Sequence, residues 1–75
     1  MAGQGFASRQ EAILAAQKDM RAVFGPDIRF EPFGPNRKIP KNFRVSDHKG
    51  HHLESFAVFQ DESGNWSWVA ATPRD

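Results

Sequence analysis

Three histidines, His48, His51 and His52, lie within five residues of one another, directly after Asp47. Imidazole and carboxylate groups are zinc ligands, and histidine is a common general base near neutral pH. If a strand begins at residue 51, His51 and His52 point to opposite faces of it, because side chains alternate along a strand. The cluster then cannot converge on one metal ion. We therefore expect no metal site and no cofactor, and we assign no catalytic residue.

Aromatic side chains are the second group that could do chemistry. Phe56, Trp66 and Trp68 fall on one face of the expected sheet, together with Arg44 and His52. Aromatic rings beside cations form a surface on which the bases of a single strand stack, at about 1–3 kcal/mol per base. The same side chains also suit a contact with another protein, or the core of the domain itself. The sequence leaves these three interpretations open.

A basic segment lies next to the aromatic residues in the sequence. Residues 35–52 carry a local charge of +4, whereas residues 53–75 carry −3 and the whole chain +1. The cations of this segment are Arg37, Lys38, Lys41, Arg44 and Lys49. Such a segment can lie along phosphates. Because the net charge is near zero, there is no bulk attraction to nucleic acid, and we favour a protein partner over nucleic acid.

No complete catalytic motif is present: the chain lacks a P-loop, G-x-S-x-G and H-E-x-x-H. The run Lys49-Gly50-His51-His52 is similar to the glycine-serine-histidine stretch of small HicA-type ribonuclease toxins, which also pair a leading helix with a three-stranded sheet. The serine and the closing helix of that family are missing here. The resemblance implies a third function class, a small ribonuclease that uses a histidine as base.

One helix is expected over residues 8–24. Ser8 and Glu11 form the S-x-x-E pattern of a capping box, and strong helix formers follow. Gly25 and Pro26 are typical of a helix end, because glycine adopts the left-handed conformation and proline cannot continue the helix. The apolar stripe of this helix is Ile13, Ala16, Met20, Val23 and Phe24.

Two similar turns predict the sheet. The pattern D-x-x-G-(H/N) occurs at 47–51 and again at 61–65, and it is typical of a three-residue hairpin loop with glycine in the left-handed position. We therefore expect an antiparallel meander of strands at 42–47, 51–61 and 65–72. A short strand follows Asp27 and stops at Pro32, and a Pro/Gly-rich basic loop covers 33–41. Residues 1–7 are expected to be a flexible tail.

The expected register assigns the faces of the sheet. Val45 lies opposite Leu53 in the first hairpin, and Val58 lies opposite Trp68 in the second. One face is then almost wholly apolar, and we expect the helix to pack on it. That face carries Phe43, Val45, Leu53, Ala57, Phe59, Val69 and Ala71. The Trp-bearing face carries Arg44, His52, Glu54, Phe56, Val58, Gln60, Trp66, Trp68 and Thr72. One helix covers one face, so the Trp-bearing face is exposed, covered by a loop or the tail, or buried in a partner.

These observations predict a single α+β domain over residues 1–75, with one N-terminal helix packed on a three- to four-stranded antiparallel sheet. Cysteine is absent, which excludes disulfides and thiolate metal sites, and we expect a cytoplasmic protein that does not enter membranes. The favoured function is a non-catalytic binding module, a stand-alone inhibitor or adaptor that makes a protein–protein contact. A homodimer through the Trp-bearing face is also expected, because so small a domain gains stability from further burial.

Overall fold

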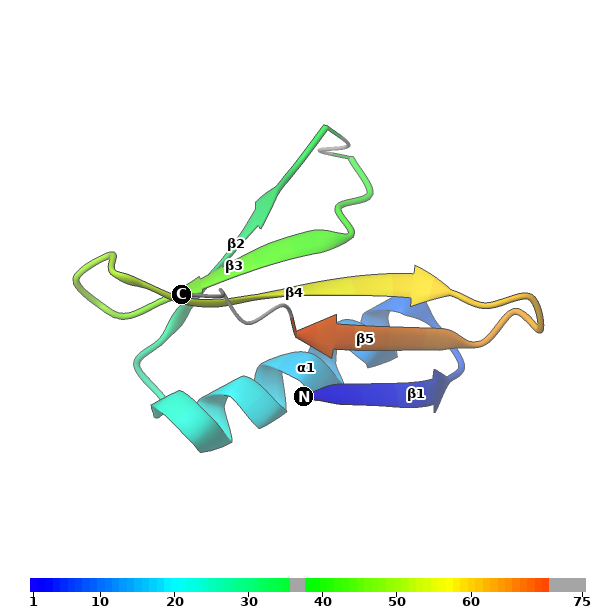
Figure 1. Cartoon of the computed structure of the whole chain (residues 1–75), viewed down its shortest axis with the longest axis horizontal. Helices are drawn as coiled ribbons and strands as arrows, with labels where there is room; N and C mark the ends of the chain where they lie inside the picture. Colours follow the sequence, from blue (N-terminus) through cyan, green and yellow to red (C-terminus); the bar gives the residue numbers. More distant parts are fainter. Residues whose placement is uncertain (36–37, 71–75) are drawn as a thin grey trace.

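The computed structural model describes residues 1–35 and 38–70 of the chain (Figure 1). Its elements are β1 (Ala2–Phe6), α1 (Arg9–Phe24), β2 (Arg29–Phe33), β3 (Asn42–Ser46), β4 (His52–Gln60) and β5 (Trp66–Ala70). The strands form one sheet in the order β1-β5-β4-β3-β2, with every neighbouring pair antiparallel. The α+β prediction is confirmed, although the sheet has five strands rather than three or four.

The extra strand is β1, where a flexible tail over residues 1–7 was the expectation. Gly3 lies opposite Trp68, and a Cβ at Gly3 would collide with Nε1 of the indole. The pairing of β1 with β5 extends one residue before Ala2, because the carbonyl of Met1 accepts a 2.9 Å hydrogen bond from the Ala70 N–H. Two glycines in five residues give this segment a low strand propensity, so its structure depends on the neighbouring strand.

The helix forms as its caps predict. The Ser8 hydroxyl accepts a 3.2 Å hydrogen bond from the Glu11 N–H, and the Gly25 N–H donates to the Arg21 carbonyl at 2.9 Å. Gly25 has a φ of 100° and ends the helix. The buried helix residues are Ala12, Ile13, Ala16 and Met20. Val23 was expected in the core but is 58% exposed, because the last turn of α1 extends past the ends of β1 and β5 (Figure 1).

The second edge strand, β2, runs through a proline. Pro32 was expected to end this strand, yet the strand continues to Phe33, one residue beyond it. Proline lacks an N–H donor and is tolerated where one side of a strand has no partner. Because β2 pairs only with β3, it provides such a position.

The two meander hairpins differ in register. The β4–β5 register is confirmed, with Val58 opposite Trp68 and Phe59 opposite Ser67. The predicted β3–β4 register is wrong by one residue: Val45 lies opposite Glu54, and Phe43 lies opposite Phe56. The pairing shifts just after the Ser46–His52 pair, which leaves Leu53 as an extra residue. Beyond such a β-bulge, every residue of the strand pairs with a partner one position further along the neighbouring strand, and so lies on the opposite face from the one expected.

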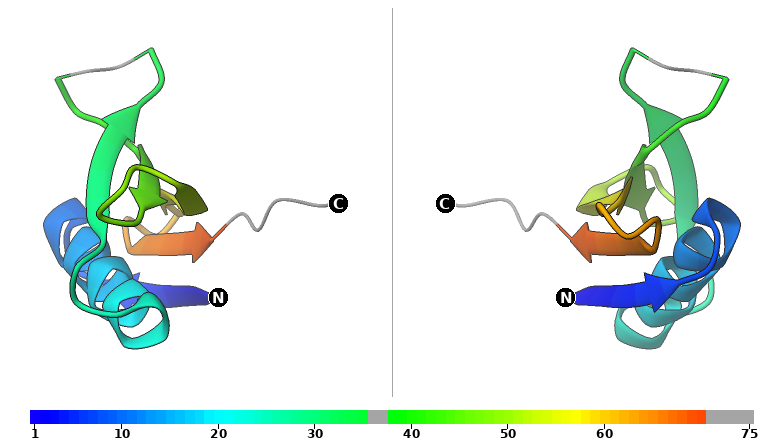
Figure 2. Two further views of the ribbon diagram at one scale, coloured as in Figure 1. Left: turned by 90° about the vertical axis from the view of Figure 1, so that its left-hand side faces the viewer. Right: turned by 90° about the vertical axis from the view of Figure 1, so that its right-hand side faces the viewer.

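This bulge decides on which face the apolar residues of β3 lie. It joins Phe43 and Val45 to the side of the sheet that carries Phe56, Val58 and Trp68, and all five are buried. α1 packs against β1, β5 and β4 on that side (Figure 2). The aromatic rings contact one another there, with Phe43 stacked on Phe56 at 5.0 Å and the Trp68 ring edge-on to Phe56 at 6.3 Å between centroids. The core therefore lies between α1 and the Trp-bearing face.

Candidate functional site: the open face of the sheet

The expected aromatic binding surface is the core of the protein. Trp68 and Phe56 are each only 1% exposed, and Trp66 is partly buried against the same cluster. None of the three can stack on a base or fill a pocket of a partner while α1 covers them. The prediction that this face binds, and the homodimer predicted through it, are therefore wrong. Among the three interpretations that the sequence left open for these aromatic residues, the core is correct.

The opposite side of the sheet, which we call the open face, is not covered by any helix or strand of the described residues (Figures 1 and 2). A row of paired residues crosses it from β2 to β1. The members of this row are Phe33, Asn42, Ala57, Val69 and Ala2. Neighbouring strands are about 4.8 Å apart, so the row is roughly 19 Å long. Four of its five side chains are apolar.

Phe59 extends this row into an apolar patch. It is 45% exposed, Val69 is 42% exposed and Phe33 is 38% exposed. An open hollow of about 510 Å³ lies next to Phe59 and Val69. Its lining consists of Ala2, Gly3, Gln4, Phe59, Asp61, Ser67, Trp68 and Val69. Sequence analysis missed this patch because it placed Phe59 and Val69 under the helix, although Ser55 on the same face is polar and could have indicated exposure.

Arg44 stands on the open face beside Phe33. Its guanidinium carbon lies 5.7 Å from the centre of the Phe33 ring. Glu31 is its direct partner across the β2–β3 pair, yet Arg44 makes no ion pair with any described residue. Stacking holds the planar guanidinium against the ring and leaves its N–H groups free to donate. Arg44 is the predicted site residue that the structure places best for contact.

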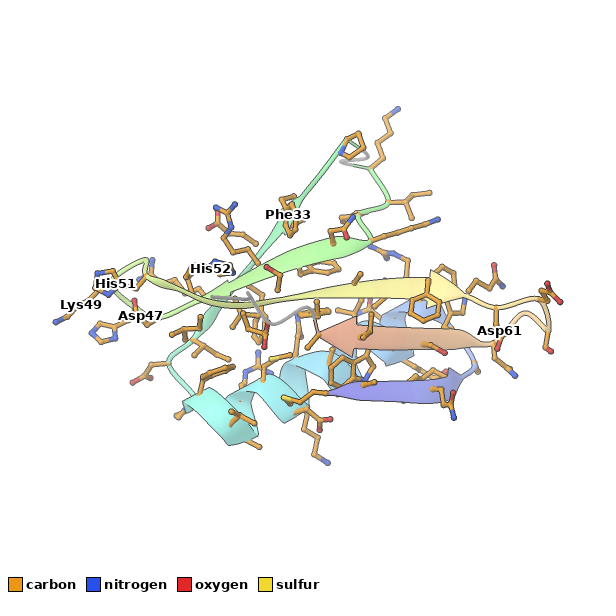
Figure 3. All side chains as sticks on the ribbon, in the orientation of Figure 1. Phe33, Asp47, Lys49, His51, His52 and Asp61 are labelled. Atoms are coloured by element: carbon orange, nitrogen blue, oxygen red, sulfur yellow. The ribbon has the colours of Figure 1, made fainter. Side chains whose placement is uncertain are left out.

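The basic segment does not form one surface. Lys38 and Lys41 precede β3, whereas Lys49 lies in the turn that follows it (Figure 3). The five residues of β3 separate these positions by roughly 16 Å. A smaller hollow of about 190 Å³ next to Lys41 is lined by Phe33, Pro35, Lys41 and Asn42. Arg37 lies outside the described residues, as do Ala71 and Thr72.

The histidines do not converge. His51 lies in the β3–β4 turn with its Nδ1 3.1 Å from the Asp47 carboxylate, whereas His52 contacts Ser55 and the Glu54 carbonyl (Figure 3). No group of three or more histidine, aspartate or glutamate side chains in the described residues could hold a metal ion.

His52 and Ser55 resemble a nucleophile–base pair by distance alone. His52 Nε2 is 3.1 Å from the Ser55 hydroxyl and 3.0 Å from the Glu54 carbonyl oxygen. A carbonyl oxygen only accepts, so the Nε2 that contacts it carries the proton. A protonated Nε2 cannot take the proton of Ser55. The arrangement therefore lacks the base that a serine nucleophile requires.

The two hairpin turns share one hydrogen-bond pattern. Asp47 Oδ1 accepts from the N–H groups of Lys49 and His51, both at 2.9 Å. Asp61 Oδ1 accepts in the same way from Ser63 at 2.9 Å and Asn65 at 3.0 Å. The two predicted turns are thus confirmed, and they lie at opposite ends of the sheet (Figure 3).

The charges of the two turns differ. The Asp47 turn also carries Lys49 and two histidines, whereas the Asp61 turn carries Glu62 and no cation. The His51 N–H is the main reason that the pKa of Asp47 lies below its ordinary value of 3.8, and the Lys49 N–H and the His51 ring lower it further. The open face therefore has an acidic end at 61–62 and an end at 47–51 that carries cationic and titratable groups.

No protein-family model matches this chain, and no curated protein or solved structure is significantly similar to it. The helix of the described residues is too short and too polar to cross a membrane.

Proposed function

We propose that this protein is a non-catalytic binding module that makes a protein–protein contact through its open face. The observation that carries the proposal is the uncovered apolar patch of Phe59 and Val69, with Phe33 at the far end of the same row. Contiguous apolar patches on a protein surface are typical of interaction sites. The patch has Arg44 at its margin, and arginine is enriched at the contacts that dominate interface energies.

Both edge strands of the sheet are poorly suited to pairing with another chain, and this favours a contact through the open face. The β1–β5 register shifts between Gly3 and Phe6, so β1 does not offer an even row of backbone groups on its outer side. β2 contains Pro32 as its fourth residue, preceded by the charged Arg29 and Glu31. Bulges, prolines and charges are the features that prevent an edge strand from pairing with another chain. The open face is therefore the better surface for association.

The role that we propose is that of an inhibitor or adaptor, in a cytoplasmic setting that the cysteine-free composition favours. Such a role requires presentation of a surface and no chemistry. The His52–Ser55 pair supports this, because its protonated Nε2 is already engaged by a carbonyl.

Capture from the organism that encodes the chain tests the proposal. A tagged protein is compared with Val69→Lys on the open face and with Val23→Lys on the outer side of α1. Val23→Lys is the matched control for Val69→Lys, because Val69 and Val23 are both exposed, at 42% and 58% respectively. We expect the same partner to be recovered with the parent and with Val23→Lys, and to be lost with Val69→Lys. Recovery of that partner by Val69→Lys would contradict the proposal.

A second candidate function, single-stranded nucleic-acid binding, is favoured by the stacked pair of Arg44 and Phe33. Lys41 lines the hollow beside Phe33, so an aromatic ring and two cations lie near one another. In this version the bases stack on Phe33, and Trp66 and Trp68 take no part. A titration with a short mixed single strand tests it: the amide signals of Phe33, Lys41 and Arg44 are expected to shift at low salt and return at physiological salt. Unchanged signals at low salt would eliminate this candidate.

A further inference from the structure

We propose that the hollow of about 510 Å³ on the open face binds an arginine side chain, presented by the protein partner. The inference rests on the proposed function, since it names the group by which that partner is held. Three features of the hollow support it. They are a carboxylate oxygen without a partner, a recessed hydroxyl without a partner and an apolar wall.

Asp61 supplies the charge, at the end of β4 (Figure 3). It is the only charged side chain among the described residues that line the hollow. Its Oδ1 accepts from the N–H groups of Ser63 and Asn65, which fixes the carboxylate. Its Oδ2 has no hydrogen-bond or ion-pair partner among the described residues. Glu62 adds a second negative charge in the same turn, so the turn favours a cationic group.

The Asp47 turn shows the same arrangement with its cation-binding oxygen already occupied. Asp47 Oδ1 accepts from two N–H groups, as Asp61 Oδ1 does, but Asp47 Oδ2 lies 3.1 Å from Nδ1 of His51. The position that corresponds to His51 in the other turn is Asn65, and no cation of the described residues pairs with Asp61. A cation from outside the chain can therefore complete the Asp61 turn.

Ser67 supplies a recessed hydroxyl in the hollow. The residue is only 7% exposed, and it lines the hollow beside Phe59, its partner across the β4–β5 pair. Its hydroxyl makes no hydrogen bond with any described residue. No side-chain nitrogen or oxygen in the described part of the chain is both fully enclosed and without a partner. The hydroxyl is therefore reached from the hollow, where a ligand that donates an N–H can satisfy it.

The wall of the hollow suits the aliphatic part of a long basic side chain. Phe59 and Val69 both line it, and they are 45% and 42% exposed. A chain of methylene groups can lie along apolar side chains while its charged end stays in water. A guanidinium group can also stack on the Phe59 ring.

The spacing of the two polar groups favours arginine over lysine. Phe59 pairs with Ser67 and Asp61 pairs with Asn65, so Asp61 and Ser67 occupy diagonal positions, where Cβ atoms are about 7–8 Å apart. A planar guanidinium has five N–H donors and can donate to both groups at once, whereas an ammonium group is a compact point charge.

An NMR titration of the full chain with a capped arginine tests the site. The probe is N-acetyl-arginine N-methylamide, which has no terminal charges, and its control is the citrulline analogue, which has the same shape without the charge. We expect the arginine probe to shift the amide signals of Ser67 and Val69 and the indole signal of Trp68, with a roughly millimolar dissociation constant. The citrulline probe should bind about three- to tenfold more weakly. Equal shifts with the two probes, or no shifts with either, overturn the proposal.

Matched variants locate the site. Asp61→Asn removes the charge and keeps an oxygen that can accept within the turn, and Asp47→Asn makes the same change in the other turn. Asp61→Asn should weaken the arginine probe about three- to tenfold, and Asp47→Asn should leave its binding unchanged. Equal affinities of the two variants for the probe overturn the proposal.

A serine variant tests the hydroxyl. Ser67→Ala should weaken the arginine probe about two- to fivefold. It should not lower the urea midpoint, because the hydroxyl makes no hydrogen bond that unfolding would break in the described residues. Binding as tight as that of the parent chain would remove Ser67 from the site and overturn the proposal as stated.

The two proposals can fail independently. A chain that loses its captured partner on Val69→Lys, but keeps it on Asp61→Asn and does not bind the arginine probe, refutes the arginine site and leaves the proposed function in place. A chain that binds the probe through Asp61, yet keeps its captured partner on Val69→Lys, refutes the proposed function and leaves the arginine site in place.

Discussion

The two faces of this sheet both carry apolar side chains, yet only one of them is core. The covered face carries Phe43, Phe56 and Trp68 in ring contact beneath α1. The open face carries smaller groups and two serines, together with Phe59 and Val69 at 45% and 42% exposure. A helix gains most by covering the bulkier side chains, because a buried aromatic residue removes about 150–250 Å² from water. The bulk of the side chains and their apolar count therefore both distinguish the core from the open face.

The largest effect should come from matched truncations on the two faces. Trp68→Ala leaves a cavity in the core and should lower the free energy of unfolding by about 3–5 kcal/mol. Phe59→Ala on the open face should lower it by less than about 1 kcal/mol, because the ring is already half in water. Urea unfolding at a concentration where the chain is monomeric measures both. Similar losses for the two variants would mean that the two faces do not differ as described.

A smaller effect is expected where β1 meets the covered face. Gly3→Ala places a methyl group against the Trp68 indole. Because the core around Trp68 is close-packed, this overpacking should cost about 1–3 kcal/mol in urea unfolding. Gly5→Ala is not a matched control, since Gly5 has a φ of 84° that strains alanine whatever the space. Ala2→Ser, in the same strand on the open face, should change stability by under about 0.5 kcal/mol. An unchanged Gly3→Ala variant would show that β1 does not pack on Trp68.

The smallest effect is expected at the end of the open face, in the Asp47 turn. The folded pKa of Asp47 lies below its unfolded value of 3.8, so the turn is stabilised above pH 3.8 and loses this stabilisation as the pH falls through the folded pKa. The amide signals of Lys49 and His51, which donate to Asp47, should move together with a midpoint below 3.8. A midpoint at or above 3.8 would contradict this account. Asp47→Asn should remove the transition.

Local signals in the sequence predicted the local parts of the fold. Ser8 and Gly25 mark the two ends of α1, and the repeated D-x-x-G pattern predicts both turns. The second turn also predicts the β4–β5 register, because no residue is inserted between that turn and Ala70. In each case the deciding interactions lie within a few residues of one another.

The remaining features depend on tertiary contacts. The bulge at Leu53 has no local signature, and it alone exchanges the partners of Phe43 and Val45. β1 has little intrinsic strand propensity and is ordered by pairing with β5. The predicted register joined Phe43 and Val45 to Phe59 and Val69, so the helix was assigned to that face and the candidate site to the other. Arg44 is exposed beside Phe33, but on the side of the sheet opposite the Trp-bearing face to which it was assigned, so its role in binding stays a prediction.

Site-specific photo-crosslinking tests the central claim most directly, because it reports contact itself. A photoreactive phenylalanine analogue replaces Phe59 on the open face in one variant and Val23 on α1 in another, and both are irradiated in the organism that encodes the chain. We predict a discrete protein adduct from position 59 and none from position 23. No adduct from position 59, or the same adducts from both positions, would contradict the claim that the open face is the contact surface.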